Sequence, residues 1–497
     1  MTRTYRTIDQ LDSVGKSKLY NNFSGGLNTS TTNDILRDEE ATIRKNWGQD
    51  ELFALKKVGG YTKKNSSAMA SAKIQGLFRV YKSSGSDEFL AVCNGAMYYS
   101  DNEGTSWTGA TAGTGLSATD FFTGVNYNDL FFFTSATDNL KHYTPSTNTV
   151  AAATDQPTNA CKVLVKRADR RMVACVNSTA SSTLYYSKVA ATGSDADDWS
   201  ATNDAGSIAI DGAKSDPLTG IASLGTYDLV YKDTTVFKVW DYPQTKAVRI
   251  IGSPGSAAPY SIAQGDGMVF SLARDSVDMW DGVAFEKVSE PVKAIVRAVD
   301  PAYIQNAFGI CRYGFYWLFY TPTGGTTNTK CIVYDIRNSN PYDRKFIWFE
   351  RDDLAMNCPV VFGGVGDDNE IYAGDSAATG FVYQLDSGTS DNTGNITAVY
   401  QTKYDNMDMP NVIKRFSKII IQYYNTSGTF TVNYYWNKGA STASYTITGT
   451  DGEGVDIQRL PDNVVGKDIS IKITHVGAST APVIKNIQID WEALYEK

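Results

Sequence analysis

A short strand that carries an aromatic residue returns through most of this chain, about 40 to 54 residues apart. Each copy is surrounded by other short apolar segments, which Gly, Ser, Thr, Asn and Asp separate. A repeat of 40 to 50 residues with several strands in each unit is typical of a β-propeller, whose sheets stand radially around an axis. The recurring aromatic residues are Tyr99, Tyr143, Tyr186, Trp240, Trp280, Tyr334 and Tyr383.

The repeat predicts one propeller over residues 51–386. Seven units can be counted, and a six-bladed ring is the alternative. The seventh unit has no obvious fourth strand, and the apolar segment 52–58 has no assigned partner. Pairing the two would close the ring and remove both free edges, which otherwise invite aggregation. We therefore expect strand 52–58 to complete the last blade.

The remaining segments have a different character. Residues 1–50 are expected to form an extended arm with one short helix at 38–47, because Asp38 can cap it and acidic residues follow. Residues 387–394 read as a polar linker. Residues 395–497 contain longer alternating strands, which predict a β-sandwich. One further helix is predicted at Ser289–Val299, with Val292, Ile295 and Val296 on one face.

Composition limits the possible functions. The 497-residue chain has a formal net charge of -8, whereas a dedicated nucleic-acid binder is usually basic. Six cysteines are scattered without metal-ligand spacing, which indicates buried free thiols and a reducing compartment. The first ten residues have no apolar core, so no signal peptide is expected. No apolar run reaches the length of a membrane span.

One motif resembles the Asp-box of sialidase-type propellers. It reads Ser100-x-Asn102-x-Gly104-x-Ser106-Trp107, with Asn in place of Asp and Ser in place of Thr. In that family the motif is a folding device in the turn between the third and fourth strands of a blade. The small polar side chains bond the turn backbone, and glycine accepts a positive φ. We therefore expect a structural turn here and no catalytic role.

No constellation of catalytic residues can be assigned. The arginines that a sialidase would need are scattered along the chain at Arg167, Arg170, Arg171, Arg249, Arg274 and Arg312. His142 and His475 are the only histidines, and neither lies in a sequence pattern typical of a zinc site or a catalytic triad. The acidic turns 195–198 and 367–370 lack calcium-loop spacing. We predict no enzyme activity, no catalytic or metal residues and no cofactor.

One basic cluster stands out, formed by Lys162, Lys166, Arg167, Arg170 and Arg171. It is expected on the surface beside a hairpin. There it could face an acidic subunit or a nucleic-acid backbone.

Both ends of the chain resemble virion proteins of tailed bacteriophages. The motifs are Gly25-Gly26-Leu27-Asn28, Leu36-x-Asp38-x-Glu40-Ala41, Asn46, the strand from Leu55 to Gly60-Tyr61, the helix Ser289–Val299 with Asp300-Pro301-Ala302, and Lys414-Arg415-Phe416. The family includes tail nozzle or hub proteins (tail tubular protein B) and head-to-tail stoppers.

The resemblance implies a structural part of the virion tail that assembles in the host cytoplasm. Six copies would form a ring around the DNA channel, in contact with portal, adaptor, tail fibre or other tail proteins. DNA would pass during ejection without sequence-specific binding, and no membrane anchor is implied. Segment 1–50 and the C-terminal region are expected as subunit contacts. Two alternatives stay open: a glycan- or receptor-binding propeller of a tail, and a sialidase-like hydrolase.

Overall fold

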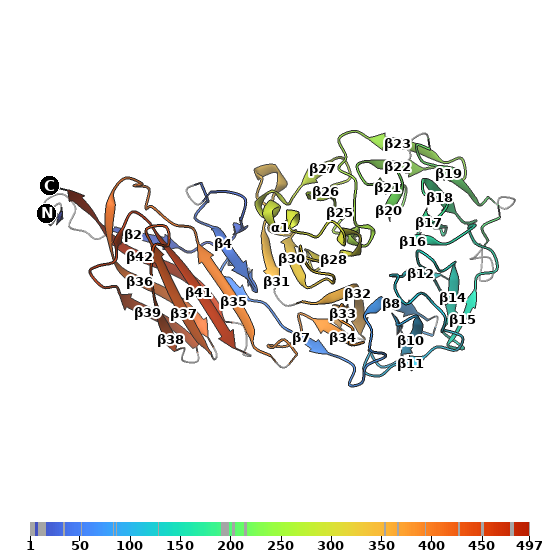
Figure 1. Cartoon of the computed structure of the whole chain (residues 1–497), viewed down its shortest axis with the longest axis horizontal. Helices are drawn as coiled ribbons and strands as arrows, with labels where there is room; N and C mark the ends of the chain where they lie inside the picture. The colour runs from blue at the N-terminus through green and yellow to red at the C-terminus, as the bar shows by residue number, and fades with distance from the viewer. Residues whose placement is uncertain are drawn as a thin grey trace.

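The structure is a computed structural model. It describes residues 5–7, 16–32, 35–50, 52–82, 84–85, 87–127, 129–189, 198–200, 204–212, 216–351, 354–364, 367–392, 394–425, 428–448, 452–477 and 482–496. Nearly all regular structure is β, arranged as a ring of radial sheets beside a second β region (Figure 1). The β-propeller predicted from the repeat is confirmed.

Six separate antiparallel sheets of four strands stand in the ring. The first blade has β8 (Ile74–Tyr81), β9 (Asp87–Cys93), β10 (Ala96–Ser100) and β11 (Thr108–Gly109). The second has β12 (Thr123–Tyr127), β13 (Leu130–Thr134), β14 (Lys141–Thr144) and β15 (Thr149–Ala152). The third has β16 (Cys161–Lys166), β17 (Met172–Asn177), β18 (Thr183–Tyr186) and β19 (Gly206–Ala209).

The chain continues around the ring in the same up-and-down order (Figure 1). The fourth blade has β20 (Leu218–Ser223), β21 (Asp228–Lys232), β22 (Val236–Trp240) and β23 (Lys246–Ile250). The fifth has β24 (Ala263–Gly265), β25 (Met268–Leu272), β26 (Val277–Trp280) and β27 (Phe285–Lys287). The closing blade has β32 (Met356–Gly364), β33 (Asp367–Asp375), β34 (Val382–Leu385) and β7 (Tyr61–Lys63).

The unit between the fifth and closing blades is not a separate sheet. Its strands are β28 (Phe308–Arg312), β29 (Phe315–Tyr320), β30 (Lys330–Asp335) and β31 (Trp348–Arg351). The innermost strand, β28, contacts β24 on one side and β32 on the other. The outermost strand, β31, is bordered by β4 (Glu40–Lys45) at Glu350 and Lys45, and these strands form one end of a ten-stranded sheet. The expectation of seven equivalent blades is therefore wrong: six are free-standing, and this sector of the ring continues into a larger sheet.

An N-terminal strand does complete the last blade, but it is not segment 52–58. The closing strand is β7, in which Tyr61 pairs with Leu385 and Lys63 with Tyr383. Segment 52–58 contains β6 (Leu55–Lys57), which pairs with β5 (Trp47–Gln49) and with β42 (Val483–Glu496) instead. The two short strands are separated by Val58, Gly59 and Gly60, and the chain passes there from one sheet to another.

The expected helix at 38–47 is also wrong, because Glu40–Lys45 is strand β4. On its other edge β4 pairs with β35 (Ile396–Thr402). It therefore lies between two strands more than 300 residues away in sequence, and their backbone groups outweigh local helix signals. Segment 1–50 is not a free arm either. Its strands β1 (Tyr5–Thr7) and β2 (Lys16–Tyr20) pair with β42, and β3 (Gly26–Leu27) pairs with β4.

The C-terminal strands belong to two sheets that share one hydrophobic cluster. The ten-stranded sheet runs on from β35 into β41 (Ile469–Gly477), β37 (Thr429–Trp436) and β38 (Ser441–Thr448). The eight-stranded sheet includes β36 (Ile413–Asn425), β39 (Gly452–Arg459), β40 (Val465–Gly466) and β42. Ile471 and Ile473 of the first sheet and Ile419 and Ile487 of the second are buried in this cluster. The β-sandwich expected for residues 395–497 stays a prediction.

Helical structure is sparse in the described chain. The predicted helix at Ser289–Val299 is present in a shorter form, as η3 (Glu290–Val292) followed by α1 (Lys293–Arg297). Its Val292, Val296 and Val299 are buried against the fifth blade. The other short helices are η2 (Pro259–Ser261), η4 (Ile304–Asn306) and η5 (Pro341–Asp343). No helix among the described residues is long and apolar enough to cross a membrane.

Candidate functional site

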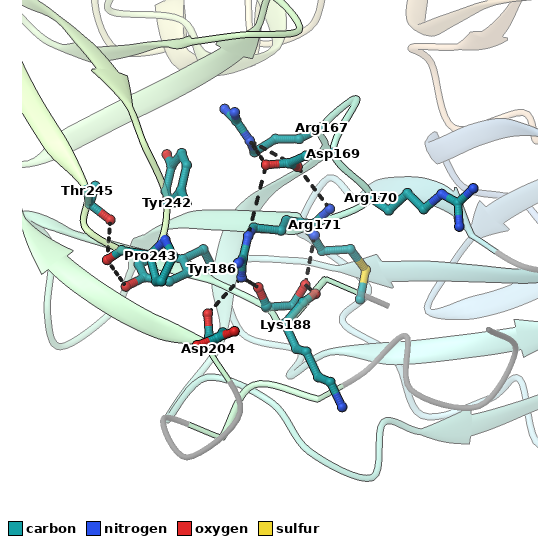
Figure 2. A network of polar contacts seen from close by, with 12 residues as sticks. Arg167, Asp169, Arg170, Arg171, Tyr186, Lys188, Asp204, Tyr242, Pro243 and Thr245 are labelled. Atoms are coloured by element: carbon teal, nitrogen blue, oxygen red, sulfur yellow. Dashed lines mark hydrogen bonds and ion pairs between the residues drawn. The ribbon is translucent and has the colours of Figure 1, made fainter. Parts of the chain in front are cut away.

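The basic cluster predicted from the sequence is divided between different roles in the structure. It begins on β16 and continues through the turn into β17, in the third blade. Arg167 and Arg171 are buried, whereas Lys166 and Arg170 are exposed. Figure 2 shows the Arg167 and Arg171 side chains meeting at Asp169, while the side chains of Arg170 and Lys188 point away from this network.

Arg167 connects the third blade to the fourth. Its Nη1 lies 2.6 Å from Oδ2 of Asp228, the first residue of β21, and its Nε lies 3.2 Å from Asp169. The guanidinium also lies 4.5 Å from the ring centroid of Tyr242. Tyr242 donates a hydrogen bond from its hydroxyl to Oδ2 of Asp228 at 2.8 Å. Burial raises the pKa of Asp228, and the Arg167 guanidinium opposes that rise.

Arg171 is used within its own blade. Its Nη1 donates hydrogen bonds to the backbone carbonyls of Ser187 and Asp204, both at 2.7 Å. These carbonyls lie on either side of the connection from β18 to β19. A guanidinium with several donors in a fixed plane suits such a task, because it can satisfy more than one carbonyl at once. The prediction that the whole cluster lies on the surface is therefore wrong for Arg167 and Arg171.

A second buried carboxylate joins the first two blades, and no sequence motif indicates it. Glu88 on β9 is completely buried. It accepts a hydrogen bond from the Tyr143 hydroxyl on β14 at 2.9 Å, and Lys82 Nζ lies 3.1 Å from its Oε2. Tyr143 is one of the recurring aromatic residues, so that repeat indicated the tyrosine but not its partner. Asp228 and Glu88 both lie in apolar strands. A single acidic residue in such a strand forms no sequence motif that would indicate a buried contact.

Lys162 lies on the inner side of the ring, together with residues from several blades. Its Nζ is 5.0 Å from the ring centroid of Tyr260 in η2, and Lys73 Nζ is 4.3 Å from that of Phe121. Phe308 of β28 contacts both aromatic rings, at centroid distances of 4.9 Å each. Burial lowers the pKa of both lysines. These contacts favour a structural role, because aromatic side chains pack together here and each cation lies over a ring face.

The Asp-box-like motif forms the turn expected of it, between the third and fourth strands of the first blade. Asn102 Oδ1 accepts hydrogen bonds from the Ser100 hydroxyl at 2.9 Å and from the Ser106 N–H at 3.0 Å. Asn102 Nδ2 donates to Ser106 Oγ at 2.8 Å. Gly104 has φ of 78° and donates its N–H to Ser100 Oγ. Trp107 packs beside Phe89. The side chains of Ser100, Asn102 and Ser106 thus form hydrogen bonds within the turn itself.

The structure does not bring the scattered arginines to one place. Arg249 lies on the outer strand β23, Arg274 pairs with Asp233 in a turn, and Arg312 stacks on Tyr313 at the end of β28. The two histidines are also far apart in the fold, on β14 and β41. Among the described residues, no group of three or more His, Cys, Asp and Glu could hold a metal ion. Residues 195–197 of the first acidic turn lie outside the described residues.

The cysteines occur as free thiols, five of them buried and Cys311 partly exposed. Burial raises the pKa of Cys93 and of Cys161 to about 11. Neutral buried thiols behave as small apolar side chains.

A groove lies on the outer part of the fourth blade. It has a volume of about 430 Å³ and is lined by Thr226, Tyr227, Lys238, Trp240, Val248 and Ile250. Lys238 Nζ lies 4.0 Å from the Tyr227 ring centroid, and Trp280 donates from Nε1 to the Tyr227 hydroxyl at 3.1 Å. Tyr227 is therefore held in place from both sides, and Trp240 is half-buried beside it.

Comparisons with known proteins identify no family for this chain. No family profile matches, and no curated protein matches. Among solved structures, the computationally designed Ika8 protein has 10% identity and a TM-score of 0.40, covering 65% of this chain and 99% of its own. U3-55K has 10% identity and a TM-score of 0.43, covering 66% of this chain and 98% of its own.

Proposed function

We propose that the protein is a structural component of a bacteriophage tail. It would act as a nozzle, hub or stopper, in a ring of copies around the DNA channel. Portal and adaptor proteins on one side, and other tail proteins on the other, would be its neighbours. The proposal rests first on the ordered motifs at both ends of the chain that resemble this family.

The observation that supports this proposal most is the position of β4. This N-terminal strand lies between β31 of the ring and β35 of the C-terminal region, so that one continuous sheet crosses from one to the other. Arg44 of β4 is buried and donates to the carbonyls of Phe23 and Trp47, both at 2.9 Å. A propeller joined to a second β body by a shared sheet resists relative motion. Such stiffness suits a part that must hold its shape while DNA passes.

The test is assembly with the proteins encoded beside it. Co-expression with the neighbouring portal and adaptor proteins is expected to give rings that electron microscopy can resolve, with this chain at a fixed position on the tail axis. Antibody labelling of intact virions provides an independent check of that position. A protein that neither joins such complexes nor occurs in virions contradicts the proposal.

The groove on the fourth blade favours a second candidate, a glycan-binding propeller of a tail. A partly exposed aromatic face beside hydrogen-bonding groups is suited to a sugar ring. The half-buried Trp240 lies in the same groove as Lys238 and Thr226. Glycan-array binding by the purified protein, lost on Trp240→Ala, would support this candidate. Trp107, which packs inside the first blade, is not a suitable control, so Tyr342→Ala is preferred because Tyr342 is 94% exposed elsewhere.

A further inference from the structure

Strand β39 forms an open edge of the eight-stranded sheet. It pairs along its full length with β36, from Lys418 opposite Arg459 to Asn425 opposite Gly452. It pairs with no other described strand. Its second edge therefore presents unpaired backbone N–H and C=O groups, and an exposed edge of this kind is a template for another strand.

Two of the four exposed side chains of β39, Val455 and Ile457, are aliphatic, and the charged Glu453 and Arg459 flank them. Val455 is 60% exposed and Ile457 is 61% exposed. Natural edge strands usually carry lysine, proline or a bulge that prevents pairing. The described part of β39 has a regular register with β36 and no bulge. The described edge carries one inward-facing charge, Asp456, but no lysine, proline or bulge that would prevent pairing with another chain.

The apolar surface continues from β39 onto the face of the sheet. Ile457 lies opposite Ile420 of β36, and Ile420 lies opposite Gln488 of β42. On the next strand Leu19 lies opposite Gln488 and is 47% exposed. One cross-strand row thus holds three aliphatic side chains, with Val455 beside it. Apolar groups gathered at an open edge mark an interaction site more often than single scattered ones do.

We propose that two copies of this chain associate by antiparallel pairing of β39 with β39, centred on Asp456. The sequence Glu453-Gly454-Val455-Asp456-Ile457-Gln458-Arg459 is self-complementary about that residue. In this register Val455 of one copy faces Ile457 of the other, and Glu453 faces Arg459. Each outward contact occurs twice because the interface is two-fold symmetric. The strands would form one continuous sheet across the dimer.

Charge selects this register over its neighbours. Side chains alternate across a strand, so only shifts of two residues keep the apolar side chains on one face. A shift of two in one direction places Val455 opposite Arg459, and in the other it places Glu453 opposite Ile457. Either shift removes the two contacts between Glu453 and Arg459. Arg459 is exposed and forms no ion pair with any described residue, so it is available to the second copy.

The centred register also has an unfavourable contact. It places the two Asp456 side chains opposite each other on the inner face, and like charges directly opposite are destabilising. Asp456→Asn removes this repulsion and is expected to tighten the dimer. A tighter dimer would distinguish β39 pairing from non-specific association of an apolar surface, because this substitution would not strengthen non-specific association.

This contact goes beyond the proposed tail ring and does not rest on it. A cyclic ring is built from head-to-tail contacts, whereas β39 pairing is a two-fold contact that closes after two chains. The two can fail separately. Assembly with portal and adaptor tests the ring, and self-association of the purified full chain tests the β39 contact.

Sedimentation equilibrium of the full chain over a concentration series is the measurement. The wild-type protein is expected to form a reversible dimer, and Val455→Thr with Ile457→Thr is expected to give a monomer with unchanged thermal unfolding. Threonine keeps the strand preference while removing apolar surface. Val283→Thr, at an apolar side chain 84% exposed on the fifth blade, should leave the dimer intact. A wild-type monomer at all concentrations, or a dimer indifferent to the double threonine variant, would overturn the proposal.

Charge reversal tests the register. Glu453→Arg and Arg459→Glu each put like charges opposite one another at both ends of the interface. Each is expected to weaken the dimer roughly tenfold, which corresponds to about 1.4 kcal/mol. The double reversal should restore it. Glu453 also pairs with Lys485 in its own chain, so Lys485→Ala is the control and should leave the dimer constant unchanged. Failure of the double reversal to recover binding excludes this register.

Discussion

Arg167 and Asp228 form an ion pair in which Nη1 lies 2.6 Å from Oδ2 and the side chains are only 4% and 0% exposed. The pair joins the turn after β16 in the third blade to the start of β21 in the fourth. Tyr242 adds a hydrogen bond to the same carboxylate oxygen. A buried pair of this kind contributes little compared with apolar packing, but loss of one partner leaves a charge without compensation.

Asp228→Ala is therefore expected to lower the free energy of unfolding by about 3 to 5 kcal/mol, because Arg167 stays buried with less compensation. The measurement is equilibrium unfolding in urea, followed by tryptophan fluorescence. Arg274→Ala is the control: its pair with Asp233 is nearly as short, at 2.8 Å, but Arg274 is 64% exposed. That change should cost less than about 1 kcal/mol. Equal losses in the two variants would contradict the argument from burial.

A pH dependence is expected from Asp278 on β26 of the fifth blade. Burial raises its pKa to about 6, although Ser276 donates a hydrogen bond to its Oδ2 at 2.5 Å. The folded protein thus holds this proton more tightly than the unfolded chain does. The stabilisation from Asp278 is complete below the ordinary pKa, near 3.8, and is lost as the pH rises through about 6.

Asp278→Asn removes that dependence, because an amide does not titrate here. Relative to wild type, the variant should gain about 2 to 3 kcal/mol of stability between pH 4 and pH 7. Unfolding in urea at both pH values measures the difference. Asp281, three residues away, gives the opposite sign, because backbone N–H groups of Ala284 and Val283 lower its pKa. Asp281→Asn should lose stability over the same interval. A shift of the same sign in both variants would show that Asp278 is not responsible.

The contribution of the Asn102 side chain to the Asp-box-like turn can be tested by two substitutions, to alanine and to aspartate. Asn102→Ala removes the acceptor for the Ser106 N–H and the donor to Ser106 Oγ, and is expected to cost about 1 kcal/mol. Asn102→Asp keeps the acceptor and introduces the residue that the Asp-box has at this position, so its stability should stay within about 0.5 kcal/mol of wild type. Thermal unfolding of the three proteins distinguishes them. A neutral alanine variant would show that the turn is held by its backbone alone.

Local sequence patterns predict the elements whose structure depends on residues close to them in the chain. The blades formed where an aromatic strand recurred, because each up-and-down sheet is built from consecutive segments. The Asn102 turn followed its motif for the same reason. Helix η3–α1 was also predicted, although its end came earlier, after Arg297 rather than Val299.

Long-range pairing decided the features that were predicted wrongly. Residues 38–47 have the capping residues of a helix, yet β4 pairs with β31 and β35, which lie more than 300 residues further along. The local sequence around β4 does not indicate that it will pair with these two strands. Arg167 was expected on the surface because its neighbours in the sequence are charged, but its partner Asp228 comes from the next blade. A buried ion pair has no local signature, since each half alone resembles an ordinary charged residue.

The choice between β6 and β7 as the closing strand depends on Gly60, which lies between them. Its N–H donates to the Gly388 carbonyl at 3.2 Å, and its own carbonyl accepts from the Ser387 N–H at 3.0 Å. A side chain at this position has no room, because an added Cβ would lie 2.0 Å from the Ser390 carbonyl oxygen and 2.4 Å from its carbon. These atoms are backbone and cannot rotate away. The chain can therefore enter the closing blade here only with a glycine.

Gly60→Ala is expected to separate β7 from β34 and to lower the free energy of unfolding by about 1 to 3 kcal/mol, as overpacking usually does. Hydrogen exchange at Val382–Leu385 measures the pairing directly and should become faster in the variant. Gly109→Ala on the outer strand β11 is the matched control, since an added Cβ there meets nothing within 4 Å. It should change stability by less than about 0.5 kcal/mol. Unchanged protection of β34 in Gly60→Ala would mean that another contact holds the ring closed.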